Sequence, residues 1–278
     1  MKEINKKKIV ILILFLLPSI KEVLADSKPQ QENKTIEIFA DQGIEWNKEK
    51  KMYTAKGNAK ASRGSSSISS DVLQAKYVET KSSENKITLI KAMGNVIIKN
   101  ETAEIKGGKN ALYDINKEYI IVKGNNLQVN SNLDELQATS KIEYWKNDNI
   151  AIATGNATAK KEGNYIIKAN RLVWHIKKND KKTDATDANE YKIKKMIAYD
   201  NVIIETKNEV AYSDKALYNK SNEICKLYGN VKLKKDDNYL TGEYAEINLN
   251  TGISKLLPYP SNNKINKNRV KAIIKTNE

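Results

Sequence analysis

Apolar and polar residues alternate along most of the chain. Between Ile90 and Lys99 every even-numbered position is apolar or Gly, whereas Lys91, Asn95 and Lys99 occupy odd positions. The stretches Met196–Ile204 and Cys225–Leu233 show the same period of two. This pattern predicts strands that bury one face and expose the other to water.

The strands contain a recurring Gly-Asn phrase, with Asp200-Asn201 as a variant. The copies begin at residues 57, 94, 124, 155, 200 and 229, so the intervals are 37, 30, 31, 45 and 29 residues. A period near 30 is typical of repeat proteins, in which each unit buries its apolar face against its neighbours. Gly in the middle of a strand marks a bend or bulge. We therefore expect each strand to bend at this phrase and to serve two sheets in succession.

A second phrase follows each Gly-Asn, as in Ser213-Asp214-Lys215-Ala216-Leu217-Tyr218. Short polar segments such as Asp236-Asp237-Asn238 and Asn250-Thr251-Gly252 separate the strands and have the composition of hairpin turns. Because such turns occur at both ends of the strands, an antiparallel meander is favoured over a parallel solenoid. The predicted fold class is all-β, with bent antiparallel strands in two facing sheets.

The first 25 residues have the pattern of a secretory signal peptide. Lysines precede an apolar run from Ile9 to Leu17, and Val23-Leu24-Ala25 offers small residues at a cleavage site. We expect cleavage after Ala25, a flexible lead-in over 26–33, and a single domain over 34–275. Within that domain, residues 177–190 are predicted to be a loop insertion, and residues 261–268 a polar linker.

The chain is basic, with a formal net charge of +14. Removal of residues 1–25 takes away five Lys and two Glu and lowers this charge to +11. A basic exported protein suggests an anionic partner such as a phosphorylated lipid or a membrane surface. However, the bias toward Lys, Asn and Ile is equally consistent with coding composition, so both interpretations stand.

The sequence offers little material for catalysis. His175 is the only histidine and Cys225 the only cysteine, so a His-based triad or a His/Cys metal site cannot be assembled. Cys225 takes an apolar position of the repeat and is expected in the interior. The two Phe and the scattered Lys argue against nucleic-acid binding. We expect a protein that is not an enzyme and has no cofactor or metal.

The repeat and the export signal together resemble the OstA-like family of lipopolysaccharide-transport proteins. The residues that carry the resemblance are Ile36–Asp41, the Gly-Asn-Val strands, the phrase Ser213–Tyr218 and the closing stretch Arg269–Ile274. It implies a twisted, V-shaped β-jellyroll in the periplasm whose apolar groove holds the acyl chains of lipid A. It also implies head-to-tail assembly between an inner-membrane transport complex and an outer-membrane translocon.

The pattern and the resemblance together predict two sets of site residues. Inward-facing apolar side chains are expected to line the groove: Ile36, Ile38, Ile90, Val96, Ile98, Val202, Ile204, Val231 and Leu233. The edges for assembly are expected at both ends of the sheet: Ile36, Ile38, Val270 and Ile273. None of these edge stretches contains Pro or enough charge to block the addition of a further strand.

Three alternatives remain open at this point. An LptC-like member of the family would keep its N-terminal apolar segment as a membrane anchor. A structural or adhesive β-repeat protein would share the fold but bind no lipid. A carbohydrate-active β-solenoid enzyme is disfavoured by the hairpin turns and by the lack of a carboxylate cluster.

Overall fold

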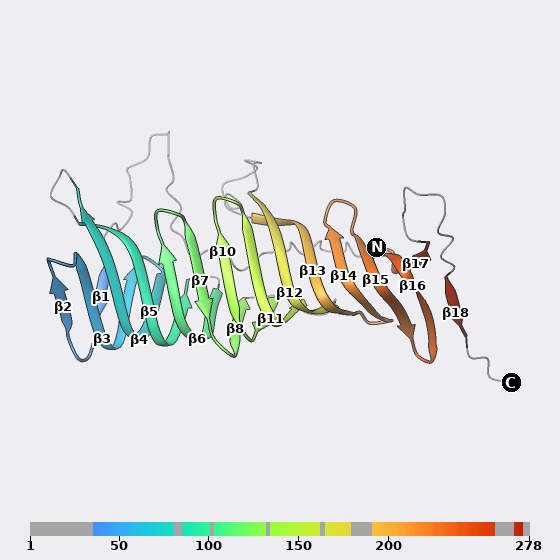
Figure 1. The fold of residues 1–278 in the computed structure, drawn as a ribbon, viewed down its shortest axis with the longest axis horizontal. Coiled ribbons are helices and arrows are strands. Elements are labelled where there is room, and N and C mark those ends of the chain that lie inside the picture. Colours follow the sequence, from blue (N-terminus) through green and yellow to red (C-terminus); the bar gives the residue numbers. More distant parts are fainter. Residues whose placement is uncertain are drawn as a thin grey trace, which may run out of the picture. The chain divides into compact units, whose positions relative to one another are not determined.

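Strands make up nearly all of the regular structure in the computed structural model, which describes residues 36–80, 85–100, 103–131, 134–161, 165–178, 191–258 and 270–274. Within these ranges no residue is helical. The chain divides into two compact units, an N-terminal unit that ends at Asp148 and a C-terminal unit that begins at Asn149. Figure 1 labels strands of both units. The predicted all-β antiparallel fold class is confirmed.

Most strands follow one another with short connections. In the N-terminal unit they are β1 (Glu37–Phe39), β2 (Ile44–Asn47), β3 (Met52–Arg63), β4 (Ser66–Glu79), β5 (Asn85–Lys99), β6 (Ala103–Asp114), β7 (Tyr119–Lys123), β8 (Leu127–Ser131), β9 (Asp134–Ala138) and β10 (Lys141–Trp145). In the C-terminal unit they are β11 (Ile150–Lys161), β12 (Tyr165–Lys178), β13 (Tyr191–Glu205), β14 (Val210–Asn219), β15 (Ile224–Lys235), β16 (Asn238–Asn248), β17 (Ile253–Leu257) and β18 (Lys271–Ile273).

Several predicted segments fall outside the described residues. These are the signal peptide over 1–25, the lead-in over 26–33, the linker over 261–268 and most of the insertion over 177–190. The first two residues of that insertion, Lys177 and Lys178, belong to the end of β12. The single domain over 34–275 stays a prediction.

Each long strand takes part in two antiparallel ladders, one on either side of its bend. The first half of β3 pairs with β2, and its second half pairs with β1. In the same way β6 pairs with β7 through residues 110–114 and with β8 through residues 103–106. In the C-terminal unit, β16 pairs with β17 and β18 through its two halves. Ladder A is the ladder to which β2, β7, β10 and β17 belong. Ladder B is the ladder to which β1, β8, β9 and β18 belong.

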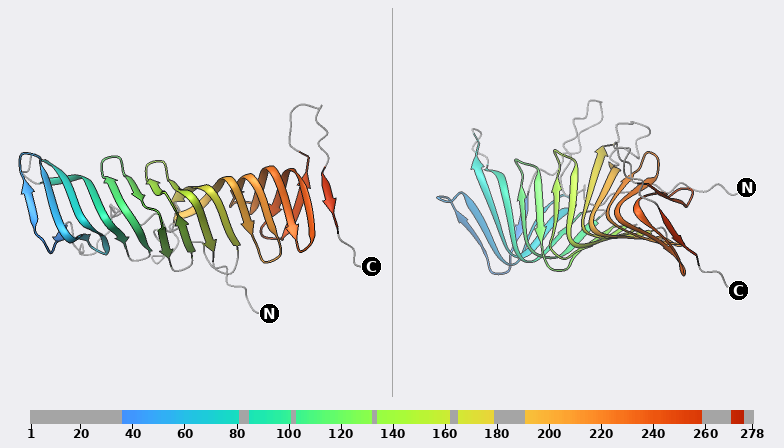
Figure 2. Two further views of the ribbon diagram at one scale, coloured as in Figure 1. Left: turned by 60° about the horizontal axis from the view of Figure 1, so that its bottom comes forward. Right: turned by 45° about the vertical axis from the view of Figure 1, so that its right-hand side comes forward.

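The Gly-Asn phrase produces the bend because both of its residues adopt positive φ. In β5, Gly94 has a φ of 74° and Asn95 a φ of 45°, and the register with β6 passes directly from Met93 to Val96. Asp200 and Asn201 do the same in β13, with φ values of 62° and 54°. Gly and Asn tolerate this left-handed region better than other residues. The resulting bends are visible in the strands of both units in Figure 2.

The Asn of the phrase also makes a hydrogen bond across the bend. In four copies its side-chain amide donates to an Asp or Asn beside the bend, which lies on a neighbouring strand or, for Asp41, in the connection between β1 and β2. The four such bonds are Asn58 to Asp41 at 2.7 Å, Asn95 to Asp71 at 3.1 Å, Asn201 to Asn170 at 3.4 Å and Asn230 to Asp214 at 2.9 Å. The second sequence phrase therefore supplies the acceptor, because Asp71, Asn170 and Asp214 are its polar positions.

The copy at Gly124 differs from the prediction of one continuous bent strand. The chain leaves the ladder over Gly124–Asn126, so that β7 and β8 are separate strands. Here Gly107 of β6 takes the positive φ, 78°, instead. A Cβ on Gly107 would lie 1.9 Å from the backbone oxygen of Asn126. The backbones approach so closely at this bend that the strand is interrupted.

We expect Gly94→Ala to lower the free energy of unfolding of the N-terminal unit more than Gly64→Ala does. Both glycines have positive φ, where Ala is strained by roughly 1–2 kcal/mol. A Cβ on Gly94 would also lie 2.0 Å from Oδ2 of Asp71, whereas a Cβ on Gly64 meets nothing within 4 Å. Denaturant unfolding followed by tryptophan fluorescence measures the difference. Equal losses would contradict a role for the close approach of Asp71.

Small and β-branched side chains fill the interior of both units. In the N-terminal unit Ala59 and Ala92 lie at the bend and are completely buried, and Leu127 and Val129 are buried on β8. In the C-terminal unit Cys225 is buried as expected, and burial raises the pKa of its thiol to about 12. This thiol therefore stays protonated and apolar in the folded protein.

Candidate functional site

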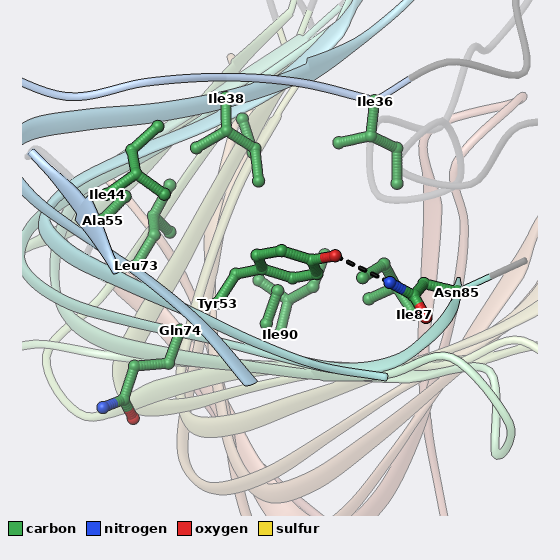
Figure 3. A pocket seen from close by; sticks show the side chains of 12 residues that line it. Ile36, Ile38, Ile44, Tyr53, Ala55, Leu73, Gln74, Asn85, Ile87 and Ile90 are labelled. Atoms are coloured by element: carbon green, nitrogen blue, oxygen red, sulfur yellow. Dashed lines mark hydrogen bonds between the residues drawn. The ribbon is translucent and has the colours of Figure 1, made fainter. Parts of the chain in front are cut away.

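The interior of the N-terminal unit is not filled everywhere. A pocket of about 450 Å³ lies between ladders A and B at the end formed by β1 to β5. Ile36, Ile38 and Ala61 contribute from the side of ladder B. Figure 3 shows Ile36 and Ile38 facing Tyr53 and Ile90 across the pocket. The volume is within the range of about 300–1,000 Å³ that is common for ligand sites.

Ladder A supplies the larger part of the lining. Ala55 and Leu73 are paired in register on β3 and β4, and Ala75 and Ile90 are paired on β4 and β5, so their side chains share one face. The remaining lining residues from this ladder are Ile44, Tyr53, Gln74, Asn85 and Ile87. Most of the lining is aliphatic, so the pocket suits an apolar ligand.

An aromatic cluster fixes the position of Tyr53 at the pocket. Its ring lies 5.7 Å from the ring of Trp46 and 5.1 Å from the ring of Tyr77, measured between centroids. The Tyr53 hydroxyl accepts a hydrogen bond from the side-chain amide of Asn85 at 2.8 Å. The Trp46 indole donates to the Tyr77 hydroxyl at 2.8 Å. These contacts hold a rigid ring with a satisfied hydroxyl beside the apolar lining.

The structure places the predicted groove residues in three groups. Ile36, Ile38 and Ile90 lie around the pocket. Val96 and Ile98 are buried in the core of the same unit. The other four, Val202, Ile204, Val231 and Leu233, are buried in the C-terminal unit. Contact of any of these residues with lipid stays a prediction.

Several residues that line the pocket are not among those predicted from the sequence. Tyr53 and Leu73 follow the same alternation as Ile90, and this signal was enough to place them on the inner face. Ile44 precedes the first Gly-Asn phrase and belongs to β2, which forms the edge of ladder A. It lines the pocket and is also 49% exposed, so the pocket borders on solvent at this edge.

Large exposed apolar side chains gather on the terminal strands. On β1 and β2 these include Phe39 and Trp46, which are 58% and 52% exposed. Around β17 and β18 they are Ile253, Val270 and Ile274. Of the predicted edge residues, Ile38 lies on β1 and Ile273 on β18, and Ile36 and Val270 immediately precede these strands.

The described residues show little sign of catalytic chemistry. They contain no group of three or more His, Cys, Asp or Glu that could hold a metal ion. Burial and the neighbouring Lys195 and Lys194 lower the pKa of His175, which lies on a ladder strand. Burial and a hydrogen bond to Glu143 raise the pKa of Tyr119 to about 12. Across the described ranges, no helix has the length and apolar character needed to cross a membrane.

Two facing antiparallel ladders with an apolar pocket between them define an all-β repeat protein that can enclose an apolar ligand. The chain belongs to the family described as LptA/(LptD N-terminal domain) LPS transport protein, whose model matches residues 37–147 and 137–253. The predicted membership in the OstA-like family is thereby confirmed. The two matches overlap over residues 137–147, next to the boundary between the two units.

Comparison with other proteins adds two findings. The chain is similar to the crystal structure of LptH from Pseudomonas aeruginosa, described as the LptA-homologous periplasmic component of the conserved lipopolysaccharide transport device. That comparison has 11% sequence identity and a TM-score of 0.23, and it covers 89% of this chain and 100% of LptH. No curated protein matches the sequence.

Proposed function

We propose that this chain is a periplasmic carrier of lipopolysaccharide that holds lipid acyl chains between its two ladders. The observation that carries the proposal is the pocket of about 450 Å³ in the N-terminal unit, which has a mainly aliphatic lining and borders on solvent at Ile44. Transfer of an acyl chain into such surroundings is favourable by about 0.8 kcal/mol for each CH₂. Membership in a family of LPS transport proteins supports the choice of ligand.

The carrier works by binding and release, without a chemical step. Its chain bridges the inner-membrane transport complex and the outer-membrane translocon as a head-to-tail oligomer. The exposed apolar side chains at β1, β2, β17 and β18 support this assembly, because unpaired strand edges add strands readily. The net positive charge of the chain favours an anionic lipid as the ligand.

Site-specific photocrosslinking tests the proposal. A photoreactive residue at Ile38 or Ile90 is expected to capture lipopolysaccharide, because both side chains line the pocket. The same residue at Lys91 or Lys99 is the matched control, since both lysines are exposed on the other face of β5. Equal labelling at the two sets of positions would count against binding between the ladders and would favour a structural or adhesive protein.

A further inference from the structure

The C-terminal unit has a second pocket, and its surroundings are polar. On β15 the inward-facing residues Val231 and Leu233 are buried, and the next residue on the same face of the strand is the exposed Lys235. On β14 the buried Ala216 and Tyr218 are followed by the half-buried Lys220, just past the end of the strand. Both lysines line a pocket of about 450 Å³ between the free ends of ladders A and B. The interior rows thus change from apolar to basic where they reach solvent.

The carboxylates that line this pocket already have partners. Glu223 forms an ion pair with Lys220 and accepts a hydrogen bond from the Tyr218 hydroxyl at 2.8 Å. Glu209 accepts a hydrogen bond from the hydroxyl of Ser254. The remaining lysines of the lining, Lys207 and Lys235, form no ion pair with any residue in the described part of the chain. Within the described residues, no carboxylate therefore neutralises their charges.

A rigid turn holds Lys207 at the pocket. The Thr206 hydroxyl accepts hydrogen bonds from the backbone N–H groups of Asn208 and Glu209, at 3.3 Å and 3.2 Å. The Thr206 N–H donates to the Glu209 carbonyl oxygen at 3.0 Å. Lys207 and Asn208 are the two central residues of this turn, so both donors project from a fixed backbone.

We propose that Lys207 and Lys235 of this pocket bind the phosphorylated, hydroxyl-rich head group of a lipid whose acyl chains lie between the ladders of the same unit. The inference rests on the proposed function and deepens it, since it assigns the polar part of an amphiphile to a site of its own. Ammonium groups bind phosphate through charge-assisted hydrogen bonds. The amides of Asn208 and Asn248 add groups that can bind hydroxyls. The chemical group that the site recognises is a phosphate, which either a lipid head group or free phosphate supplies.

Isothermal titration of the mature chain with three probes tests this inference. The probes are dodecyl phosphate, dodecyl maltoside and inorganic phosphate, the first two below their critical micelle concentrations. The double variant Lys207→Gln/Lys235→Gln is expected to bind dodecyl phosphate at least about ten-fold more weakly, because two charge-assisted bonds are lost. Its affinity for dodecyl maltoside is expected to stay unchanged. The double variant Lys91→Gln/Lys99→Gln, with the same change of charge on the exposed face of β5, is expected to behave as the wild type.

Each outcome has a defined meaning. Selective loss of dodecyl phosphate binding supports a head-group site, whereas binding of inorganic phosphate that is equally strong and equally dependent on the two lysines assigns the site to free phosphate. Unchanged binding of dodecyl phosphate in the Lys207/Lys235 variant overturns the inference. If neither amphiphile binds the wild type, the proposed carrier function fails, and the result with inorganic phosphate still decides on the phosphate site.

Discussion

Replacement of Ala61 by Trp is expected to weaken lipopolysaccharide binding at least about ten-fold. Ala61 lines the pocket from β3 and lies opposite Ile38 of β1 in register. An indole at this position would occupy space that acyl CH₂ groups otherwise fill. Displacement of only two CH₂ groups removes about 1.6 kcal/mol, which corresponds to more than ten-fold in affinity. Displacement of a fluorescent lipopolysaccharide measures the effect.

The neighbouring residue provides the control for this substitution. Lys60 is exposed on the opposite face of β3, so Lys60→Trp adds the same indole outside the pocket. We expect this variant to bind lipopolysaccharide as the wild type does. Thermal unfolding of both variants verifies that the fold is retained. Undiminished binding by a folded Ala61→Trp variant would exclude the pocket as the site of the acyl chains.

The bends show which features of the fold can be predicted from the sequence alone and which cannot. The Gly-Asn phrase and its Asp-Asn variant were sufficient to predict the bends at five of the six copies, but not the interruption of the strand at Gly124. The role of the following Asn was not predictable, because its partner at the neighbouring bend lies far away in the chain. Asn95 donates to Asp71, for example, 24 residues earlier. Only the register of β4 against β5 brings these two side chains together.

The pocket shows a second limit of sequence analysis. Ile90 and Val96 lie on the same face of β5, and alternation predicted this correctly. However, Val96 is 1% exposed in the core, whereas Ile90 lines the pocket. Alternation reports which face a residue occupies, but not whether other side chains fill the space above it. Whether this space is filled depends on how many further strands the ladder has on that side, and near β1 and β2 it has few.

The terminal strands were easier to predict. The edges of the sheet were expected at Ile36 and Ile38 and at Val270 and Ile273, and the structure has the short strands β1 and β18 there. Their pairing partners could not be predicted, because each binds only one half of a bent strand. β18 pairs with residues 239–241 of β16, and β17 pairs with residues 244–248. Each end of the chain therefore carries one edge strand for each ladder.

The directions of these edge strands fit an antiparallel junction between two copies. β1 runs toward the bend of ladder B, because it is antiparallel to the second half of β3. β18 runs away from the bend, because it is antiparallel to the first half of β16. β18 of one copy beside β1 of the next would therefore continue ladder B with the strand alternation preserved. The same reasoning applies to β17 and β2 in ladder A.

From this geometry we expect the chain to form head-to-tail oligomers. We also expect that either of two substitutions, one at each end of the sheet, abolishes them. Phe39→Lys places a charge on the edge strand β1, where the phenyl ring is 58% exposed. Ile273→Pro removes a backbone donor from β18 and disfavours further pairing. Each variant alone is expected to remain monomeric in light scattering across a concentration series. Ile97→Lys, a substitution at an exposed apolar residue of β5 away from both edges, is expected to leave the oligomers intact.

A mixture of the two edge variants distinguishes head-to-tail assembly from any other mode. The Phe39→Lys chain keeps an intact β17–β18 edge, and the Ile273→Pro chain keeps an intact β1–β2 edge. An equimolar mixture can therefore form a single junction, after which both outer edges are blocked. We expect a 1:1 dimer that does not grow with concentration. A mixture that stays monomeric, or one that forms larger species, would contradict an interface between the last strands of one copy and the first strands of the next.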